Sequence, residues 1–256
     1  MASKINPVDP IYQRTDQFKP NQAEHWVIPP EKMGWLLANN AMRCEMKLFR
    51  EALVSMNERG ETLKEWELKA LTTAANTHFS NIHSNHKIKA GILAPACHQR
   101  FKCPEKLELE IDRAAVIKKL DSIKTIVGGL TTSDKIDNLL EHWIEYEKMM
   151  LLYLLDEETV IPLYRAYFDQ KSAGEVAQKI MKNMAPAEFG SLLYFDKDHV
   201  FRTDLMNFLN IPSISWKVEF EKNLKLFAVE FIGNVEALID GKESYLSNFL
   251  SYLSLY

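Results

Sequence analysis

The segment MMLLYLLDEETVIPLYRAYF, residues 149–168, decides the fold class of this 256-residue chain. Its apolar run covers 149–155 and is far shorter than the ~20 residues that a membrane-spanning helix needs. The run is therefore typical of a helix that is buried in a globular protein. We expect this helix to run towards Pro162, because proline interrupts helical hydrogen bonding. No membrane partner is expected.

Outward from this segment, the chain reads as long amphipathic stretches separated by glycine and proline. The nine glycines and ten prolines are sparse, and apolar residues such as Met42, Met46, Phe49 and Leu53 recur at helical spacing. The predicted helices cover 31–57, 62–93 with Pro95 as the stop, a third from after Pro104 to 128–129, and a fourth from the N-cap cluster 132–134. Short connections between four such helices predict an all-α, antiparallel four-helix bundle.

Three regions follow from this pattern. Residues 1–30 are polar and contain prolines, which predicts an extended N-terminal arm, and residues 31–168 form the expected bundle. Residues 169–256 remain helical in character, with a short helix near 197–209 and a stripe made of Phe220, Leu224, Phe227, Phe231 and Leu238. We interpret this last region as a helical extension packed on the bundle.

Composition excludes several functional classes. Apolar residues make up 46% and charged residues 26%, and the net charge of −4 comes without a basic run. A nucleic-acid partner is therefore not expected, because phosphate binding needs clustered lysine and arginine. Three cysteines are an odd number without zinc spacing, which favours reduced thiols. With no signal-peptide pattern at the N-terminus, we expect a cytoplasmic location.

Three stretches resemble the haemerythrin-like family, also called the HHE cation-binding domain. They are FSNIHSNHKIKAGILAPACHQR (79–100), CPEKLELEIDRAAVIKKLD (103–121) and the segment 149–168, so the resemblance covers roughly 35–168. It implies a helical bundle that holds a di-iron cofactor through histidines and carboxylates. It also implies the usual roles of that family, which are oxygen binding and iron or oxygen sensing.

The residues depart from the family pattern on every helix. The first-helix histidine position falls on Asn39, and the third-helix position on Arg113, or on Ile111 in another register. On the fourth helix Tyr153 replaces the expected histidine, whereas Glu157, four residues later, matches the carboxylate of the family.

The second helix allows two registers. In one, the expected His-x-x-x-Glu pair falls on Asn85 and Lys89, and in the other it falls on His86 and Ala90. Neither register supplies the carboxylate, and the charge of a lysine repels a metal ion. The resemblance therefore predicts a degenerate metal site without a bound cofactor.

The function predicted from these residues is a metal-free binding or interaction module, with an unknown protein or small molecule as its partner, and the residues favour binding over catalysis without deciding between them. One alternative is a small-molecule pocket or an enzyme active site in the vacated core, lined by Asn39, Lys89, Arg113, Tyr153 and Glu157. The other is residual binding of iron or oxygen through His83, His86 and Glu157. Where the metal has been lost, a buried Glu157 needs a positive charge, which we expect Lys89 or Arg113 to supply.

Overall fold

The computed structural model describes residues 32–100, 110–196, 203 and 216–243. Every regular element in these ranges is helical. In chain order the elements are α1 (Gly34–Arg59), α2 (Glu65–Ile88), η4 (Lys89–Leu93), α3 (Ala94–His98), α4 (Glu110–Gly129), α5 (Asp137–Glu158), α6 (Ile161–Tyr167), α7 (Gln170–Met181), α8 (Pro186–Phe195), η6 (Trp216–Phe220), α11 (Glu221–Phe227), η7 (Ala228–Ile232) and α12 (Gly233–Asp240).

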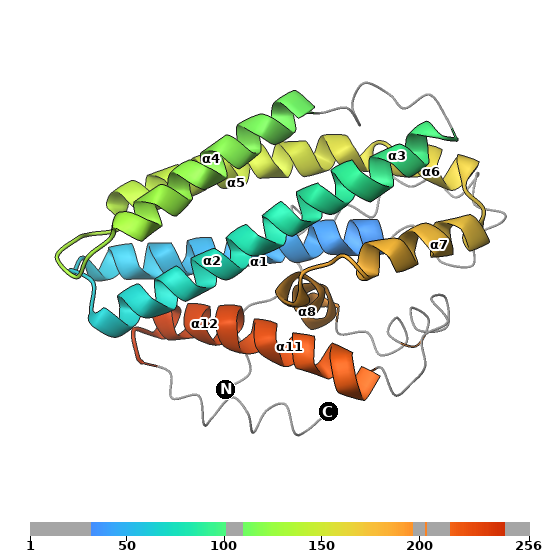
Figure 1. Ribbon diagram of the computed structural model, residues 1–256. Helices are drawn as coiled ribbons and strands as arrows, with labels where there is room; N and C mark the ends of the chain where they lie inside the picture. The colour runs from blue at the N-terminus through green and yellow to red at the C-terminus, as the bar shows by residue number, and fades with distance from the viewer. Residues whose placement is uncertain (1–31, 101–109, 197–202, 204–215, 244–256) are drawn as a thin grey trace.

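The long helices pack in three layers (Figure 1). The hairpin of α4 and α5 forms one outer layer, and the hairpin of α1 and α2 forms the middle one. Helices α8, α11 and α12 form the third layer, against the other face of α1 and α2. The middle helices are therefore buried on two sides. For this reason the buried residues of α1 include Asn39, Arg43 and Glu45 as well as its apolar stripe.

The core is continuous across these layers. Met42, Met46, Phe49 and Leu53 of α1 lie in the same buried cluster as Phe227, Phe231 and Leu238 from the C-terminal part. Each large apolar side chain buried in this way contributes roughly 1.5–3 kcal/mol. The C-terminal stripe thus shares its core with the first helices.

The end of α2 contradicts one expectation about its boundary. Pro95 was expected to stop the helix, but α2 continues through η4 into α3 and ends at His98. The η4 segment is a π-turn in which the Ala94 amide donates to the Lys89 carbonyl, five residues earlier. This wider turn accommodates a proline that has no amide hydrogen to donate, and such π-turns are frequent at functional sites.

A close contact between α8 and α11 depends on glycine. A Cβ atom built on Gly190 would lie 2.1 Å from the backbone oxygen of Asn223 and 2.8 Å from Cβ of Phe227. The two helices therefore approach backbone to backbone, as only glycine permits. Because α8 also contacts α1 and α2, α8 joins the third layer to the middle one.

The remaining predicted boundaries differ by a few residues. The first helix ends at Arg59, where Gly60 adopts a φ of 65°. The fourth begins at Asp137, because Asp134 instead accepts from the Thr131 amide in a turn before the helix. Residues 1–30, the start of the third helix and, apart from residue 203, the short helix near 197–209 lie outside the described residues. In the described part of the chain, none of the helices has the length and apolar character needed to span a membrane.

Candidate functional site

A buried ion pair joins the end of α2 to the end of α5. Nζ of Lys89 lies 2.5 Å from Oε2 of Glu157, and both side chains are almost fully buried. Lys89 is the first residue of the π-turn, so its side chain leaves the helix where the backbone widens. The ion pair that the sequence predicted for Glu157 is therefore present, with Lys89 as its cation.

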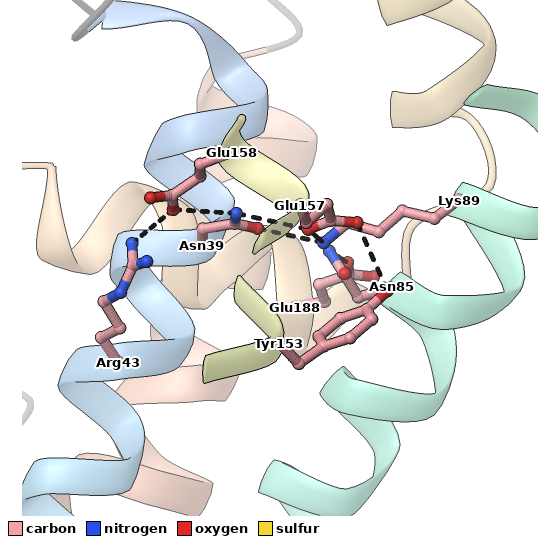
Figure 2. A network of polar contacts seen from close by, with 8 residues as sticks. All are labelled: Asn39, Arg43, Asn85, Lys89, Tyr153, Glu157, Glu158 and Glu188. Atoms are coloured by element: carbon pink, nitrogen blue, oxygen red, sulfur yellow. Dashed lines mark hydrogen bonds and ion pairs between the residues drawn. The ribbon is translucent and has the colours of Figure 1, made fainter. Parts of the chain in front are cut away.

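Asn39 of α1 connects this pair to a second one (Figure 2). Its Oδ1 accepts from Nζ of Lys89 at 3.0 Å, and its Nδ2 donates to Glu158 at 3.0 Å. Glu158 in turn pairs with Arg43, with Nη1 and Oε1 separated by 2.6 Å. Two carboxylates that follow each other on α5 thus each have a cation, and a single asparagine bridges them.

Burial and charge act in opposite directions on Lys89. Loss of water lowers the pKa of its amine, while the carboxylate of Glu157, and more weakly those of Glu158 and Glu188, raise it. The Tyr153 hydroxyl donates to Glu157 over 3.4 Å. Burial raises the pKa of Tyr153 well above its usual range, so this hydroxyl keeps its proton at neutral pH.

Glu188 of α8 approaches the same region from the third layer (Figure 2). Its carboxyl group accepts from Oγ of Ser84 at 2.5 Å and from Nδ2 of Asn85 at 3.2 Å, both on α2. It also accepts from the amide of Ala185 at the start of its own helix. Burial raises the pKa of Glu188 to about 7, although these hydrogen bonds and Lys89 oppose the shift.

His86 differs from the residues above, because none of its side-chain polar atoms is hydrogen-bonded. The residue is only 5% exposed, yet neither ring nitrogen has a hydrogen-bond partner. Its ring lies against Tyr153, with the two centroids 5.3 Å apart. Burial, followed by the charges of Lys89 and Arg113, lowers the pKa of His86 to about 3, so the ring is neutral at neutral pH.

Arg113 of α4 also acts on Tyr153. It lowers the pKa of the Tyr153 hydroxyl, against the larger upward effect of burial, while its own buried Nε has no hydrogen-bond partner. Oδ1 of Asn85, on the same helix as His86, is also buried without a partner. Four polar atoms therefore have no hydrogen-bond partner: the two ring nitrogens of His86, the donor Nε of Arg113 and the acceptor Oδ1 of Asn85.

The predicted site residues therefore fall into two groups. Asn39, Lys89 and Tyr153 each hydrogen-bond Glu157. Asn85 instead donates to Glu188, while His86 and Arg113 both act on Tyr153. The side chain of Ile111, the alternative to Arg113, lies outside the described residues.

The predicted metal candidates are not brought together. The His83 side chain is 42% exposed, and its Nε2 lies 3.4 Å from Asp121, while Glu157 is occupied by Lys89. In the described ranges, no group of three or more His, Cys, Asp or Glu side chains is arranged to hold a metal ion.

A second buried cluster was not predicted from the sequence. Glu45 of α1 accepts from Nδ1 of His78 at 2.7 Å, from Asn81 at 3.0 Å and from the Ser191 hydroxyl. The Tyr146 hydroxyl lies 2.9 Å from Nε2 of His78. One signal was available in the sequence: Glu45 directly precedes Met46, a position of the predicted buried stripe.

Comparison with known proteins gives little family information. The chain is 27% identical over 149 residues to a MEMO1 family protein of Aquifex aeolicus (strain VF5). The match covers 54% of this chain and 40% of that relative, so the chain spans well under two thirds of the relative's length. No family model matches the chain, and no solved structure matches it.

These findings correct the family prediction. The assignment to the haemerythrin-like family is wrong, because the relative carries the name of a different family and no family model supports it. The function predicted from it, a haemerythrin-like module that has lost its di-iron ligands, is overturned with it. The physical reason is that helical spacing of apolar residues and histidines is shared by unrelated helical proteins, so spacing alone does not identify a family.

Proposed function

We propose that this protein binds a small polar molecule in its interior, beside His86 and between α2, α4 and α5. The observation that carries the proposal is the His86 ring, which is buried with both nitrogens unpaired. A buried polar group without a partner costs roughly 1–3 kcal/mol. A molecule that hydrogen-bonds the ring removes this cost, and that gain favours binding.

The surroundings of His86 supply complementary groups. Nε–H of Arg113 is an unused donor, Oδ1 of Asn85 is an unused acceptor, and the Tyr153 ring provides an apolar wall beside the imidazole. A few placed polar groups next to an aromatic ring are typical of small-molecule sites. The ion pair of Lys89 and Glu157 supports this wall, because Glu157 accepts from the Tyr153 hydroxyl.

We also propose how the four long helices are arranged. We interpret α1, α2, α4 and α5 as one antiparallel four-helix unit, since α1 contacts α2 and α5 and α4 contacts α2 and α5. The site then lies inside this unit, near the end where α2 passes into η4. The cytoplasmic location stays a prediction.

The experiment follows the ring nitrogens of His86 by ¹⁵N NMR on the full chain. The probes are acetate, acetamide and glycerol, each added to protein that was purified without them. We expect at least one probe to shift the His86 resonances and to raise the melting temperature, because a ligand that binds the native state stabilises it. His86→Phe should abolish the gain in melting temperature, and His83→Phe, a partly exposed position on the same helix, should retain it.

Two results would overturn the proposal. The first is that none of the probes moves the His86 resonances or the melting temperature, which would mean that ordered water serves the ring. The second is that a probe stabilises the wild type and His86→Phe equally, which would place its binding elsewhere.

A further inference from the structure

The cations around this site differ in their partners. Lys89 pairs with Glu157, and Arg43 pairs with Glu158. The carboxyl group of Glu188 also acts on Lys89. Arg113, by contrast, has no carboxylate partner among the described side chains, and its Nε–H is buried and unpaired. A ligand beside His86 therefore meets a guanidinium that has no counterion of its own.

The available donors match an anion better than a cation. His86 is held neutral by burial, which lowers its pKa to about 3, so one ring nitrogen carries a hydrogen that it can donate. Arg113 offers an Nε–H on a planar guanidinium, whose edge suits the two oxygens of a carboxylate. A metal cation at the same place would be repelled by Arg113 and Lys89, since both charges act on the His86 ring.

We infer that the molecule bound beside His86 is a small carboxylate, which Arg113 and the His86 N–H hold together. This inference rests on the proposed function and adds the chemical class of the ligand. One carboxylate oxygen accepts from Nε of Arg113 and the other from His86, while the Tyr153 ring covers the carbon skeleton. The Oδ1 atom of Asn85 remains for a hydroxyl or amine hydrogen of the same molecule.

The experiment compares acetate with acetamide, which has nearly the same shape and no charge. At constant ionic strength, acetate should shift the His86 ring resonances and raise the melting temperature, and acetamide should bind at least about tenfold more weakly. Arg113→Gln should weaken acetate binding by about tenfold or more and remove the preference for the charged probe. Lys118→Gln is the matched control, because Lys118 is exposed on the same helix.

The outcomes separate the two proposals. If acetamide or glycerol binds at His86 as well as acetate does, the carboxylate class is wrong and the binding function stands. If none of the probes reaches His86, both fail. Should Arg113→Gln not fold, as judged by circular dichroism, Arg113→Lys keeps the charge but loses the planar donor edge. It should still weaken acetate binding, and unchanged binding would overturn the role of Arg113.

Discussion

His78 and His86 lie eight residues apart on α2, and the structure surrounds them in opposite ways. Both are buried, with exposed fractions of 0% and 5%. Both ring nitrogens of His78 are engaged, one by Glu45 and the other by Tyr146. Neither nitrogen of His86 is engaged. Burial alone therefore does not separate the two histidines, whereas the number of hydrogen-bonded ring nitrogens does, and the proposed function assigns ligand binding to the unbonded ring.

The neighbours explain why the two ends of the interior differ. Around His78 the Glu45 carboxylate accepts from two residues of α2 and from Ser191 of α8, so one anion joins three helices from two layers. Around His86 the carboxylates of Glu157 and Glu158 pair with Lys89 and Arg43, and Glu188 accepts from Ser84 and Asn85. We call the first end the closed network, because both nitrogens of His78 and the Glu45 carboxylate are bonded, although Oδ1 of Asn81 is unpaired. At the second end both ring nitrogens of His86 and Nε of Arg113 are unpaired. We expect this contrast to appear in the free energy of unfolding of variants at the two ends.

The largest effect is expected from Lys89→Met. This change leaves Glu157 buried without its cation, and breaking one partner of a buried pair typically costs about 3–5 kcal/mol. The double variant Lys89→Met with Glu157→Leu should recover most of that loss, because an apolar pair carries no unpaired charge. Chemical denaturation of both variants measures the free energies of unfolding.

Lys87→Met is the control for this experiment, because Lys87 is exposed on the same helix and should change stability by less than about 0.5 kcal/mol. A Lys89→Met variant as stable as the control would show that Glu157 does not need the lysine. A double variant no better than Lys89→Met would contradict the charge argument.

The next effect is expected from His78→Phe. It removes the donor to Glu45 and the partner of Tyr146, and leaves both groups buried, at a cost of about 2–4 kcal/mol. Urea denaturation gives the value. Asn81→Leu, which removes only one donor to Glu45, should cost less, and a reversed order would refute the picture of His78 as the centre of the closed network.

Much of the fold could be predicted from the sequence, for physical reasons. The stripe of Met42, Met46, Phe49 and Leu53 is buried, and the all-helical class follows from such periodicity. The passage of the helix through Pro95 was not predictable by local rules, because proline normally ends a helix. Here Leu93 and Cys97, on either side of Pro95, pack in an apolar cluster with residues of other helices. Such packing depends on segments that are distant in sequence.

The site was predictable in part. Lys89 and Glu157 were expected to pair because a buried carboxylate needs a cation, and the structure brings them together. The roles of Glu45 and Glu188 were missed, because a lone glutamate in a helical sequence reads as a solvated residue. Their partners, His78 and Ser191 for one and Ser84 for the other, lie 33–146 residues away in the chain.

A smaller effect concerns pH and Glu188. Its pKa is raised from 4.5 to about 7 by burial, so the folded chain binds a proton that the unfolded chain has already released between these values. Stability is therefore highest at and below pH ~4.5 for this group and falls as pH rises to about 7. Relative to Glu188→Gln, the wild type should lose about 2 kcal/mol between pH 5 and pH 7.

Glu188 accepts hydrogen bonds from Ser84, Asn85 and the backbone amide of Ala185, and the charge of Lys89 also acts on it. These four groups remain in Glu188→Gln, so the comparison isolates the carboxyl group itself. Glu141→Gln, at an exposed position of α5, is the control and should follow the wild-type pH profile. Parallel profiles for Glu188→Gln and the wild type would show that Glu188 does not titrate in this range.

The smallest effect is expected at His86, and it completes the contrast with His78. In the absence of ligand, His86→Phe removes two unpaired polar atoms and keeps a ring against Tyr153, so the gain from removing them offsets the cost of the larger side chain. The free energy of unfolding at neutral pH should change by less than about 1 kcal/mol, against about 2–4 kcal/mol for the same substitution at His78.

Acid sharpens the test, because the folded pKa of His86 is lowered from 6.5 to about 3. The unfolded chain then binds a proton between these values that the folded chain does not, so the wild type loses stability as pH falls from about 6.5. His86→Phe should lack this loss, and denaturation at pH 7 and pH 5 measures it. Equal costs for the two histidines at neutral pH would mean that His86 is structural and that the open nitrogens carry no binding role.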